Sequence, residues 1–235
     1  MPDPILSITA LDAHYGDFQA LYGLDMELHE GEVLAIIGAN GAGKTTLMRS
    51  ISGLMQNGAD QVRYRGRPIG ALRADQVAGL GLALVPEGRQ LFPSLSVEEN
   101  LLIGGRMQRP GPWSLEAVFD LFPILKERRA VPSTSLSGGQ QQMVAIGRAL
   151  MSNPDLILFD EISLGLAPVI IKSIYDALPD IVGTGMSAMI VEQDISKALS
   201  VSDRLYCLQE GRVSLEGPSD SVSRDAISAA YFGVA

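Results

Sequence analysis

The sequence predicts an α/β protein built on a mainly parallel sheet, and three observations support this fold class. Short apolar runs alternate with helical patterns along most of the chain, and strands joined by helices form parallel sheets through right-handed crossovers. The 235 residues are enough for one α/β domain that buries a core of its own. Although 46% of the residues are hydrophobic, no apolar run approaches the roughly 18 residues that a membrane-spanning helix needs.

The first predicted strands and the first helix surround a glycine-rich turn. Apolar and polar residues alternate over 24–28, which is typical of a half-buried strand. Residues 33–37 are a continuous apolar run, which indicates a strand buried on both faces. A helical pattern follows the turn and continues through residue 51. We then expect a peripheral antiparallel hairpin over 62–67 and another short buried strand over 82–85.

Strand patterns disappear in the middle of the chain, between about residues 88 and 147. Helical stretches dominate there instead, and Pro123 marks a break in one of them. We therefore predict one domain, in which a helical subdomain (88–147) is inserted into a core made of residues 1–87 and 148–235.

Strand–helix alternation resumes after this helical segment. The pattern predicts strands over 156–159 and 187–191, with one helix beginning at Pro168 and another ending near Leu199. Two further strands flank the dipeptide Glu210-Gly211, which favours a hairpin turn.

The charge is distributed unevenly along the chain. Residues 1–43 contain seven acidic residues and no lysine or arginine, so they carry −7 of the formal net charge of −9. Secretory and organellar targeting peptides need early basic residues, so we expect none here. An acidic chain without a basic block also argues against nucleic-acid binding. The single cysteine, Cys207, lies in an apolar strand pattern and predicts a buried thiol in a reducing compartment.

A glycine-rich loop follows the 33–37 strand and opens the next helix, and its spacing matches the phosphate-binding pattern G-x-x-x-x-G-K-[ST]. Glycines let backbone N–H groups turn inward around an anion, and the helix directs its positive end at the same point. In this pattern Lys44 reaches the β- and γ-phosphates of a nucleotide, and the Thr45 hydroxyl binds Mg²⁺. The alternative is a glycine turn without a ligand. The loop consists of Gly38, Ala39, Asn40, Gly41, Ala42, Gly43, Lys44 and Thr45.

Two carboxylates, Asp160 and Glu161, directly follow the apolar run over 156–159. Ligands bind at the carboxyl ends of the strands in such sheets, so these side chains are candidates for chemistry. We expect Asp160 to hold Mg²⁺, usually through water, and Glu161 to act as a base that orients and polarises an attacking water. The alternative is a strand end with two solvated acids.

A second helix N-terminus suited to an anion lies at residues 136–140, with the sequence Leu-Ser-Gly-Gly-Gln. The turn opens a helix that is predicted from Gln141 to Met151. One nucleotide needs only one cradle, so a second cradle serves a phosphate that is held elsewhere. The alternative is a serine N-cap followed by two flexible glycines. The position of the motif between the glycine-rich loop and the acid-tipped strand favours the anion site.

In this order and at this spacing, the three motifs resemble those of an ABC-transporter nucleotide-binding subunit. The resemblance extends from about Leu6 to Gly233. It implies a P-loop ABC-type ATPase core with a peripheral antiparallel β subdomain, an inserted helical signature subdomain, and ATP and Mg²⁺ as cofactors. Four further stretches are similar to the ATP-binding subunits of branched-chain amino acid importers, and urea and short-amide importers share much of them. These stretches are 85–89, 97–101, 163–168 and 191–193.

The resemblance implies roles for further residues. Tyr15 would stack on adenine, with a strand aromatic in the core as the alternative. Glu87 stands where the family offers a glutamine to Mg²⁺, and Gln193 stands where most members have a histidine that contacts the γ-phosphate. Residues 137–139 would bind the γ-phosphate held by an opposing subunit, so that two subunits enclose two ATP molecules. Residues around 88–115 would line the groove that receives a coupling helix of a membrane subunit.

The motifs and the resemblance together define three sets of predicted site residues. The predicted catalytic residues are Lys44, Glu161 and Gln193. The predicted Mg²⁺ ligands are Thr45, Glu87 and Asp160. The predicted ATP contacts are Tyr15, Gly38, Asn40, Gly41, Ala42, Gly43, Lys44, Thr45, Thr46, Ser137, Gly138, Gly139 and Gln140.

The chain departs from the broad family pattern at four positions. Glu87 replaces the glutamine, Gln193 the histidine, Ala167 an aspartate and Ile162 a proline. The first three resemble the amino acid importer branch, whereas Ile162 departs even from that branch. These replacements favour pairing with a second, non-identical ABC ATPase subunit over a strongly active homodimer.

The resemblance thus predicts an ATP-hydrolysing subunit that powers an importer, with branched-chain or hydrophobic amino acids as the expected substrates. Its partners would be transmembrane permease subunits and, indirectly, an extracytoplasmic substrate-binding protein. It would be cytoplasmic and peripheral on the inner face of the cell membrane. Two alternatives stay open: the ATPase of a urea or short-amide importer, and a soluble ABC-type assembly scaffold without a membrane partner. A GTPase is disfavoured because the chain lacks an Asn-Lys-x-Asp stretch for guanine.

Overall fold

The computed structural model describes residues 3–232, which divide into two compact units. The first unit contains the residues up to 80 and from 187 onward, and the second contains residues 81–186. The first unit is therefore built from both ends of the chain, and the second from its middle. Within residues 3–232, no helix combines the length and the apolar character that crossing a membrane requires.

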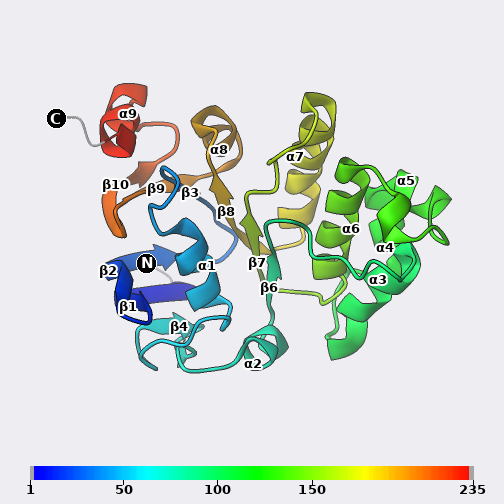
Figure 1. The fold of residues 1–235 in the computed structure, drawn as a ribbon, viewed down its shortest axis with the longest axis horizontal. Helices are drawn as coiled ribbons and strands as arrows, with labels where there is room; N and C mark the ends of the chain where they lie inside the picture. The colour runs from blue at the N-terminus through cyan, green and yellow to red at the C-terminus, as the bar shows by residue number, and fades with distance from the viewer. Residues whose placement is uncertain (1–2, 233–235) are drawn as a thin grey trace. The chain divides into compact units, whose positions relative to one another are not determined.

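The first unit contains a four-stranded antiparallel sheet with the strand order β2-β1-β4-β5. β1, β2 and β4 are labelled in Figure 1. The long strands β1 (Leu6–Tyr15) and β2 (Phe18–Leu28) pair with each other, and β1 also pairs with β4 (Val62–Tyr64). β4 and β5 (Arg67–Pro68) form the hairpin that the sequence predicts over 62–67. The expected antiparallel β subdomain is thus confirmed.

A mainly parallel group of strands, in the order β10-β9-β3-β8, forms the second sheet region of this unit. β3 (Val33–Ile37) runs parallel to β8 (Ser187–Glu192) and to β9 (Arg204–Gln209), whereas β10 (Arg212–Pro218) returns antiparallel to β9. Residues 34–37 are completely buried. The prediction of a strand covered on both faces is therefore confirmed.

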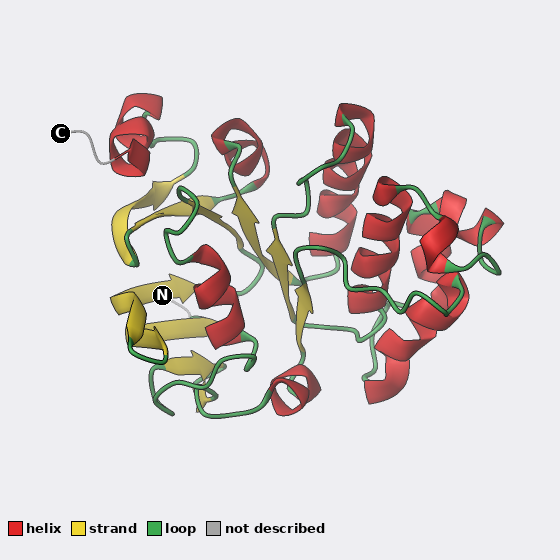
Figure 2. Cartoon of the chain, in the orientation of Figure 1, coloured by secondary structure: helices red, strands yellow, loops and turns green. Residues whose placement is uncertain are grey.

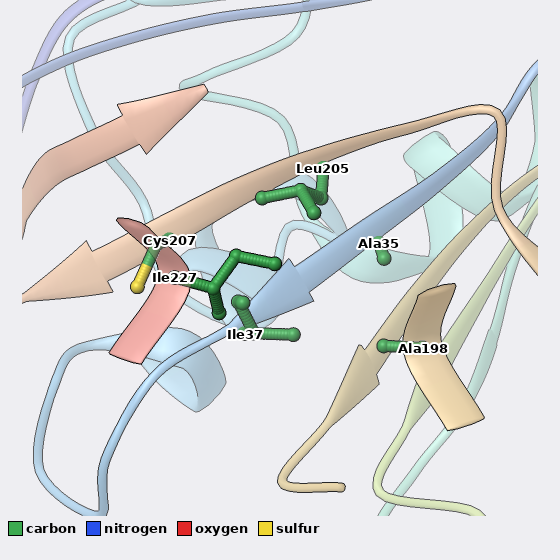
Figure 3. Close-up of a cluster of buried hydrophobic side chains, with 6 residues drawn as sticks. All are labelled: Ala35, Ile37, Ala198, Leu205, Cys207 and Ile227. Carbon is green, nitrogen blue, oxygen red and sulfur yellow. The ribbon is translucent and has the colours of Figure 1, made fainter. Parts of the chain in front are cut away.

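The described residues of the first unit also form the helices α1 (Lys44–Ile51), α2 (Ala74–Gly79), α8 (Ile195–Val201) and α9 (Arg224–Phe232). One buried hydrophobic cluster joins β3 and β9 to α8 and α9 (Figure 3), and its members are Ala35, Ile37, Ala198, Leu205, Cys207 and Ile227. Cys207 is completely buried, as predicted. Burial raises the pKa of its thiol, so it remains a protonated, unreactive core residue.

The second unit contains one parallel strand pair and a set of helices. β6 (Leu82–Val85) pairs with β7 (Leu156–Asp160), and Val85 lies opposite Phe159. Apart from an isolated bridge between Ser96 and Pro132, residues 88–147 form only helices, turns and loops (Figure 2), as the sequence predicts. The helices are α3 (Val97–Gly104), η1 (Gly105–Met107), α4 (Leu115–Leu121), α5 (Pro123–Glu127), η2 (Ser133–Ser135), α6 (Gly138–Leu150) and α7 (Pro168–Val182).

Two helix boundaries in this unit show how local chemistry decides where a helix begins. α4 ends before Phe122 and α5 begins at Pro123, which confirms the predicted break because proline is favoured in the first turn. α6 begins at Gly138, earlier than the predicted start at Gln141, because Ser137 caps it. The assignment of residues 88–147 as a signature subdomain, with 1–87 and 148–235 as a catalytic core, stays a prediction.

β1, α2 and α9 have no counterpart among the elements that the sequence predicts, and the short helices η1 and η2 were not predicted individually. The apolar alternation of β1 is interrupted by shifts of register between Ile8, Leu11, Ala13 and His14 in its pairing with β2. Leu6 and Ile8 are buried, and so are Leu11 and Ala13, so the alternation slips by one residue between Ile8 and Leu11. A single two-residue period therefore cannot be followed through the strand. α2 contains six residues, which is too few for a helical period to be recognised.

Candidate functional site

The loop that joins β3 to α1 folds back around its own lysine. Lys44 is 4% exposed, and its Nζ donates hydrogen bonds to the carbonyl oxygens of Gly38 (2.7 Å) and Ala39 (3.1 Å). The ammonium group therefore lies against the start of the loop and not in open solvent. A lysine held there can exchange a carbonyl oxygen for a phosphate oxygen at little cost in its own conformational freedom.

Two glycines permit the close turns of this loop. Gly43, the N-cap of α1, has a φ of 102°, and a Cβ there would lie 2.6 Å from Cδ2 of Leu21. A Cβ at Gly38 would collide with the carbonyl oxygen of Leu208. Because no side chain caps α1 at Gly43, the first N–H groups of this helix are suited to an anion.

The turn between β9 and β10 supports the loop from its other side. Gly211 N–H donates to the carbonyl oxygen of Ala42 (3.1 Å), and the Gly211 carbonyl accepts from the N–H of Tyr22 (3.0 Å). Gly211 has a φ of 74°, and a Cβ there would overlap the carbonyl oxygen of Ala20. The predicted Glu210-Gly211 hairpin turn is therefore confirmed, and it fixes the phosphate loop to β2.

The first turn of α1 carries Thr45, which is half-buried, and Thr46, which is buried. The Tyr15 hydroxyl lies 3.4 Å from the Thr46 Oγ1, and Arg49 donates to the same hydroxyl at 3.4 Å. Tyr15 is 43% exposed, so it is not the core aromatic of the alternative interpretation. Its stacking on adenine stays a prediction.

The parallel pairing of β3 and β8 brings Gln193 to the phosphate loop. Ile37 lies opposite Glu192 in this register, so the next residues, Gly38 and Gln193, leave the sheet side by side. The helix that follows is held by Asp194, whose carboxylate accepts from the N–H groups of Ser196 and Lys197. Gln193 is half-buried.

In the second unit, α6 begins with a complete capping box. The Ser137 Oγ accepts from Gln140 N–H (3.3 Å), and the Gln140 Oε1 accepts from Ser137 N–H (3.0 Å). The serine N-cap of the alternative interpretation is therefore present. This cap leaves the N–H groups of Gly138 and Gly139, at the positive end of the helix, outside the two bonds of the box.

The two glycines of this motif have different surroundings. A Cβ at Gly139 would overlap the Ile170 side chain at the start of α7, so Gly139 is required for packing. A Cβ at Gly138 would lie 3.2 Å from Nη2 of Arg89. The Arg89 guanidinium also donates to the Gln141 Oε1 (3.3 Å). A cation thus lies beside the positive end of α6. The sequence motifs give Arg89 no role, because its neighbour Gln141 is distant in sequence.

The strand pair of the second unit brings three carboxylates to one edge. Val85 lies opposite Phe159, so Glu87 follows β6 at the same edge where Asp160 and Glu161 end β7. Asp160 is 4% exposed, Glu161 is half-buried and Glu87 is exposed. The carboxyl ends of parallel strands are where such sheets bind ligands.

Glu161 has a left-handed backbone, with a φ of 50°. This conformation costs a residue other than glycine about 1 kcal/mol or more. The next residue, Ile162, is 1% exposed. Its side chain is therefore a core residue that holds the turn after β7, which accounts for an apolar residue at this position.

The predicted Mg²⁺ ligands are all oxygen donors: the Thr45 hydroxyl and the carboxylates of Glu87 and Asp160. Hard cations such as Mg²⁺ prefer these donors. Within the part of the chain that the structure describes, no three His, Cys, Asp or Glu side chains form a metal cage. Mg²⁺ that arrives with a nucleotide needs few protein ligands, because phosphate oxygens and waters complete its octahedron. The donor set therefore fits this cation.

The predicted site residues fall into two groups, one in each unit. The first unit brings together Tyr15, residues 38–46 and Gln193. In the second unit, Glu87, Asp160 and Glu161 share one sheet edge, and residues 137–140 open α6. Their joint action on one nucleotide stays a prediction.

Comparison with protein families decides the identity of the chain. Residues 21–163 match the family described as ABC transporter. The chain belongs to this family. The ABC protein is 40% identical to the high-affinity branched-chain amino acid transport ATP-binding protein BraG of Pseudomonas aeruginosa, over 97% of this chain and 100% of BraG. It is 31% identical to a probable branched-chain amino acid transport ATP-binding protein, LivF of Archaeoglobus fulgidus, over 93% and 94% of the two chains.

Solved structures of ABC cassettes share the fold of this ABC protein. A nucleotide-free ATP-binding cassette from an ABC transporter superposes with a TM-score of 0.81 at 28% identity, over 97% of this chain and 95% of that one. The ADP conformation of another ATP-binding cassette gives a TM-score of 0.80, also at 28% identity, over 97% and 94%. The ABC protein is thus an ABC-type ATPase with the expected P-loop fold.

Proposed function

We propose that this ABC protein is the ATP-hydrolysing subunit of an importer for branched-chain or other hydrophobic amino acids. The observation that carries the proposal is the phosphate loop, in which a buried lysine lies over a glycine turn and the helix that follows has no side-chain cap. The substrate class rests on the 40% identity to BraG, which covers nearly all of both chains.

In the proposed mechanism, the first unit binds the nucleotide. Lys44 releases its carbonyl partners and bonds the β- and γ-phosphates, while the N–H groups of residues 41–46 surround the β-phosphate. Tyr15, exposed beside α1, provides an aromatic face for adenine. Mg²⁺ bound with ATP would neutralise phosphate charge, held by Thr45, Asp160 and Glu87.

Glu161 performs the chemical step as we propose it. Its carboxylate accepts a proton from water and orients that water toward the γ-phosphate. The left-handed backbone of Glu161 is followed directly by the buried Ile162, which anchors the turn that carries the carboxylate. Gln193 would donate to the γ-phosphate from its side chain amide, where most members use a histidine.

A second ATPase subunit completes the proposed site. Residues 137–139, with Gln140 bonded to Ser137, would bind the γ-phosphate of a nucleotide held by the partner. The equivalent residues of the partner would bind the γ-phosphate of the nucleotide held by this chain. A bacterial ABC cassette described as dimeric is 25% identical to this chain with a TM-score of 0.80, over 91% and 98% of the two chains, which supports a dimer. The replacements at Glu87, Ala167 and Gln193 favour a non-identical partner.

The proposed setting is the inner face of the cell membrane. The catalytic core (1–87 and 148–235) would hydrolyse ATP, and the signature subdomain (88–147) would receive permease subunits, which in turn accept the amino acid from an extracytoplasmic substrate-binding protein. ATP binds the closed dimer more tightly than the open one. That difference in affinity is what can drive the permeases through their cycle.

Two variants with a matched control test the ATPase part of the proposal. Lys44→Ala should abolish ATP binding or turnover, whereas Lys172→Ala, at a side chain that is 74% exposed, should behave like the wild type. Glu161→Gln should retain ATP, fail to hydrolyse it and accumulate as a dimer. Normal turnover by Glu161→Gln would refute the role of that carboxylate.

Purification of the tagged chain from solubilised membranes tests the transport part. Two polytopic proteins and a second ATPase should accompany it, and cells that lack the gene should lose uptake of labelled leucine. Loss of urea or short-amide uptake instead would favour the neighbouring importer class. Recovery of soluble partners alone would overturn the importer and favour an assembly scaffold.

A further inference from the structure

Residues 87–92, which follow β6 and are called the Glu87 segment below, have a backbone that needs support from other parts of the unit. Arg89 and Gln90 both have left-handed backbones, with φ values of 65° and 45°. Residues other than glycine and asparagine rarely adopt this conformation, and two in succession are rarer. The segment begins with Glu87, a predicted Mg²⁺ ligand, so whatever holds this backbone also determines where that carboxylate lies.

Arg148 of α6 supplies this support. Its guanidinium donates to the carbonyl oxygens of Gln90 (2.9 Å) and Arg89 (3.2 Å), which are the two strained residues. It also stacks over Phe92, with its Cζ 5.6 Å from the ring centroid. The planar guanidinium can form all three contacts at once, whereas a lysine ammonium on its flexible stem cannot reproduce the forked geometry.

A second link runs in the opposite direction, from the segment to the first turn of α6. The Arg89 guanidinium donates to the Gln141 Oε1 (3.3 Å) and lies beside Gly138. The segment is thus attached near the N-terminus of α6 through Arg89 and near its C-terminus through Arg148. The first turn of α6 carries the Ser-Gly-Gly motif, so the motif and the Glu87 segment are fastened to one helix.

The far end of the segment has its own attachment. Phe92 N–H donates to the Asn100 Oδ1 (2.9 Å), and the Phe92 carbonyl accepts from the Ser133 hydroxyl (2.9 Å). Asn100 is completely buried. Removal of the Arg148 guanidinium therefore releases only the part around Arg89 and Gln90, and the rest of the subdomain keeps its packing.

We propose that Arg148 is a positioning residue that fastens the Glu87 segment to the signature helix, so that the Mg²⁺ contact and the partner's γ-phosphate contact move as one body. This role rests on the proposed function. Its consequence is that the signal of bound Mg²⁺–ATP reaches the Ser-Gly-Gly motif through the two arginine links, and Arg148 provides the one that holds the two strained residues. The phosphate loop belongs to the first unit and Arg148 to the second, so we expect ATP binding without Mg²⁺ to be independent of Arg148.

The test compares Arg148→Lys and Arg148→Met with Arg129→Lys. Arg129 forms a similar forked bond, to Glu98 at 2.9 and 2.7 Å, in the same unit. Arg148→Lys keeps the charge and loses the fork, and Arg148→Met keeps only the apolar stem. Binding of a fluorescent ATP analogue without Mg²⁺, the Mg²⁺ concentration for half-maximal turnover, kcat and Tm are measured for each protein as the full chain with its copurified partners.

Both Arg148 variants should bind the Mg²⁺-free analogue within about twofold of the control. Their kcat should fall about tenfold and the half-maximal Mg²⁺ concentration should rise severalfold, because the Glu87 segment is no longer held in place. In the Glu161→Gln background they should lose the ATP-dependent dimer.

Two results would overturn the role of Arg148. One is that both Arg148 variants have the same kcat and the same Mg²⁺ dependence as Arg129→Lys. The other is that kcat falls only as far as a lowered Tm explains, while the Mg²⁺ dependence is unchanged. Absence of ATP turnover in the wild type would instead overturn the proposed function, and this role with it.

Discussion

The two glycines that open α6 should respond in opposite ways to the addition of one methyl group. A Cβ at Gly139 would overlap the Ile170 side chain, whereas a Cβ at Gly138 would meet the flexible end of Arg89 at 3.2 Å. In a helix, alanine is favoured over glycine by about 0.5–1 kcal/mol, and overpacking a tight contact costs about 1–3 kcal/mol. We therefore expect Gly138→Ala to be neutral or stabilising and Gly139→Ala to lose about 1–2 kcal/mol.

Thermal unfolding followed by circular dichroism measures this difference. For a chain of this size, a loss of 1–2 kcal/mol lowers Tm by about 2–8 °C. Ile170→Ala removes the overlapping Cγ1 and Cγ2 carbons, so the double variant Gly139→Ala/Ile170→Ala should lose less stability than the sum of the two single changes. A wild-type Tm for Gly139→Ala, or two losses that simply add, would refute the steric reasoning.

Two further predictions follow from buried and capped groups. Cys207 should resist a thiol reagent in the folded protein, because the side chain is fully buried and burial raises the pKa of its thiol. It should react once the protein is denatured. Rapid labelling of the folded chain would contradict this. Hydrogen bonds from the N–H and hydroxyl of Ser96 lower the pKa of Glu99, so its contribution to stability is complete above its ordinary pKa of about 4.3 and is lost as the pH falls through the lowered value. The difference in Tm between the wild type and Glu99→Gln should therefore shrink below about pH 4.3, and a constant difference would contradict this assignment.

The parts of the fold that follow from short-range rules could be predicted from the sequence. Twelve consecutive residues, 33–44, contain the apolar run of β3, the glycines of the loop and Lys44. The strand, the turn and the start of the helix can therefore be predicted together. β1 is different, because its bulges shift the alternation that would have revealed it.

The candidate site divides in the same way. The motifs identify Lys44, Ser137, Asp160 and Glu161, since each lies in a local pattern that chemistry requires. Arg148 could not be identified in this way, because its partners lie 58 and 59 residues earlier in the chain. The role of this arginine becomes visible only from the contacts between α6 and that segment.

The support of the phosphate loop by Gly211 has a consequence for how the chain acquires its activity during synthesis. The loop leaves the ribosome early, but its neighbouring strands β8 and β9 and its supporting turn come from residues 187–211. Contacts between such distant segments form late, because the intervening chain must first be closed into a loop. The contiguous middle of the chain, 81–186, can fold before then. We therefore expect nascent chains that stop short of Gly211 to be unable to hold ATP, so the cell would not meet a partly made ATPase that is already loaded.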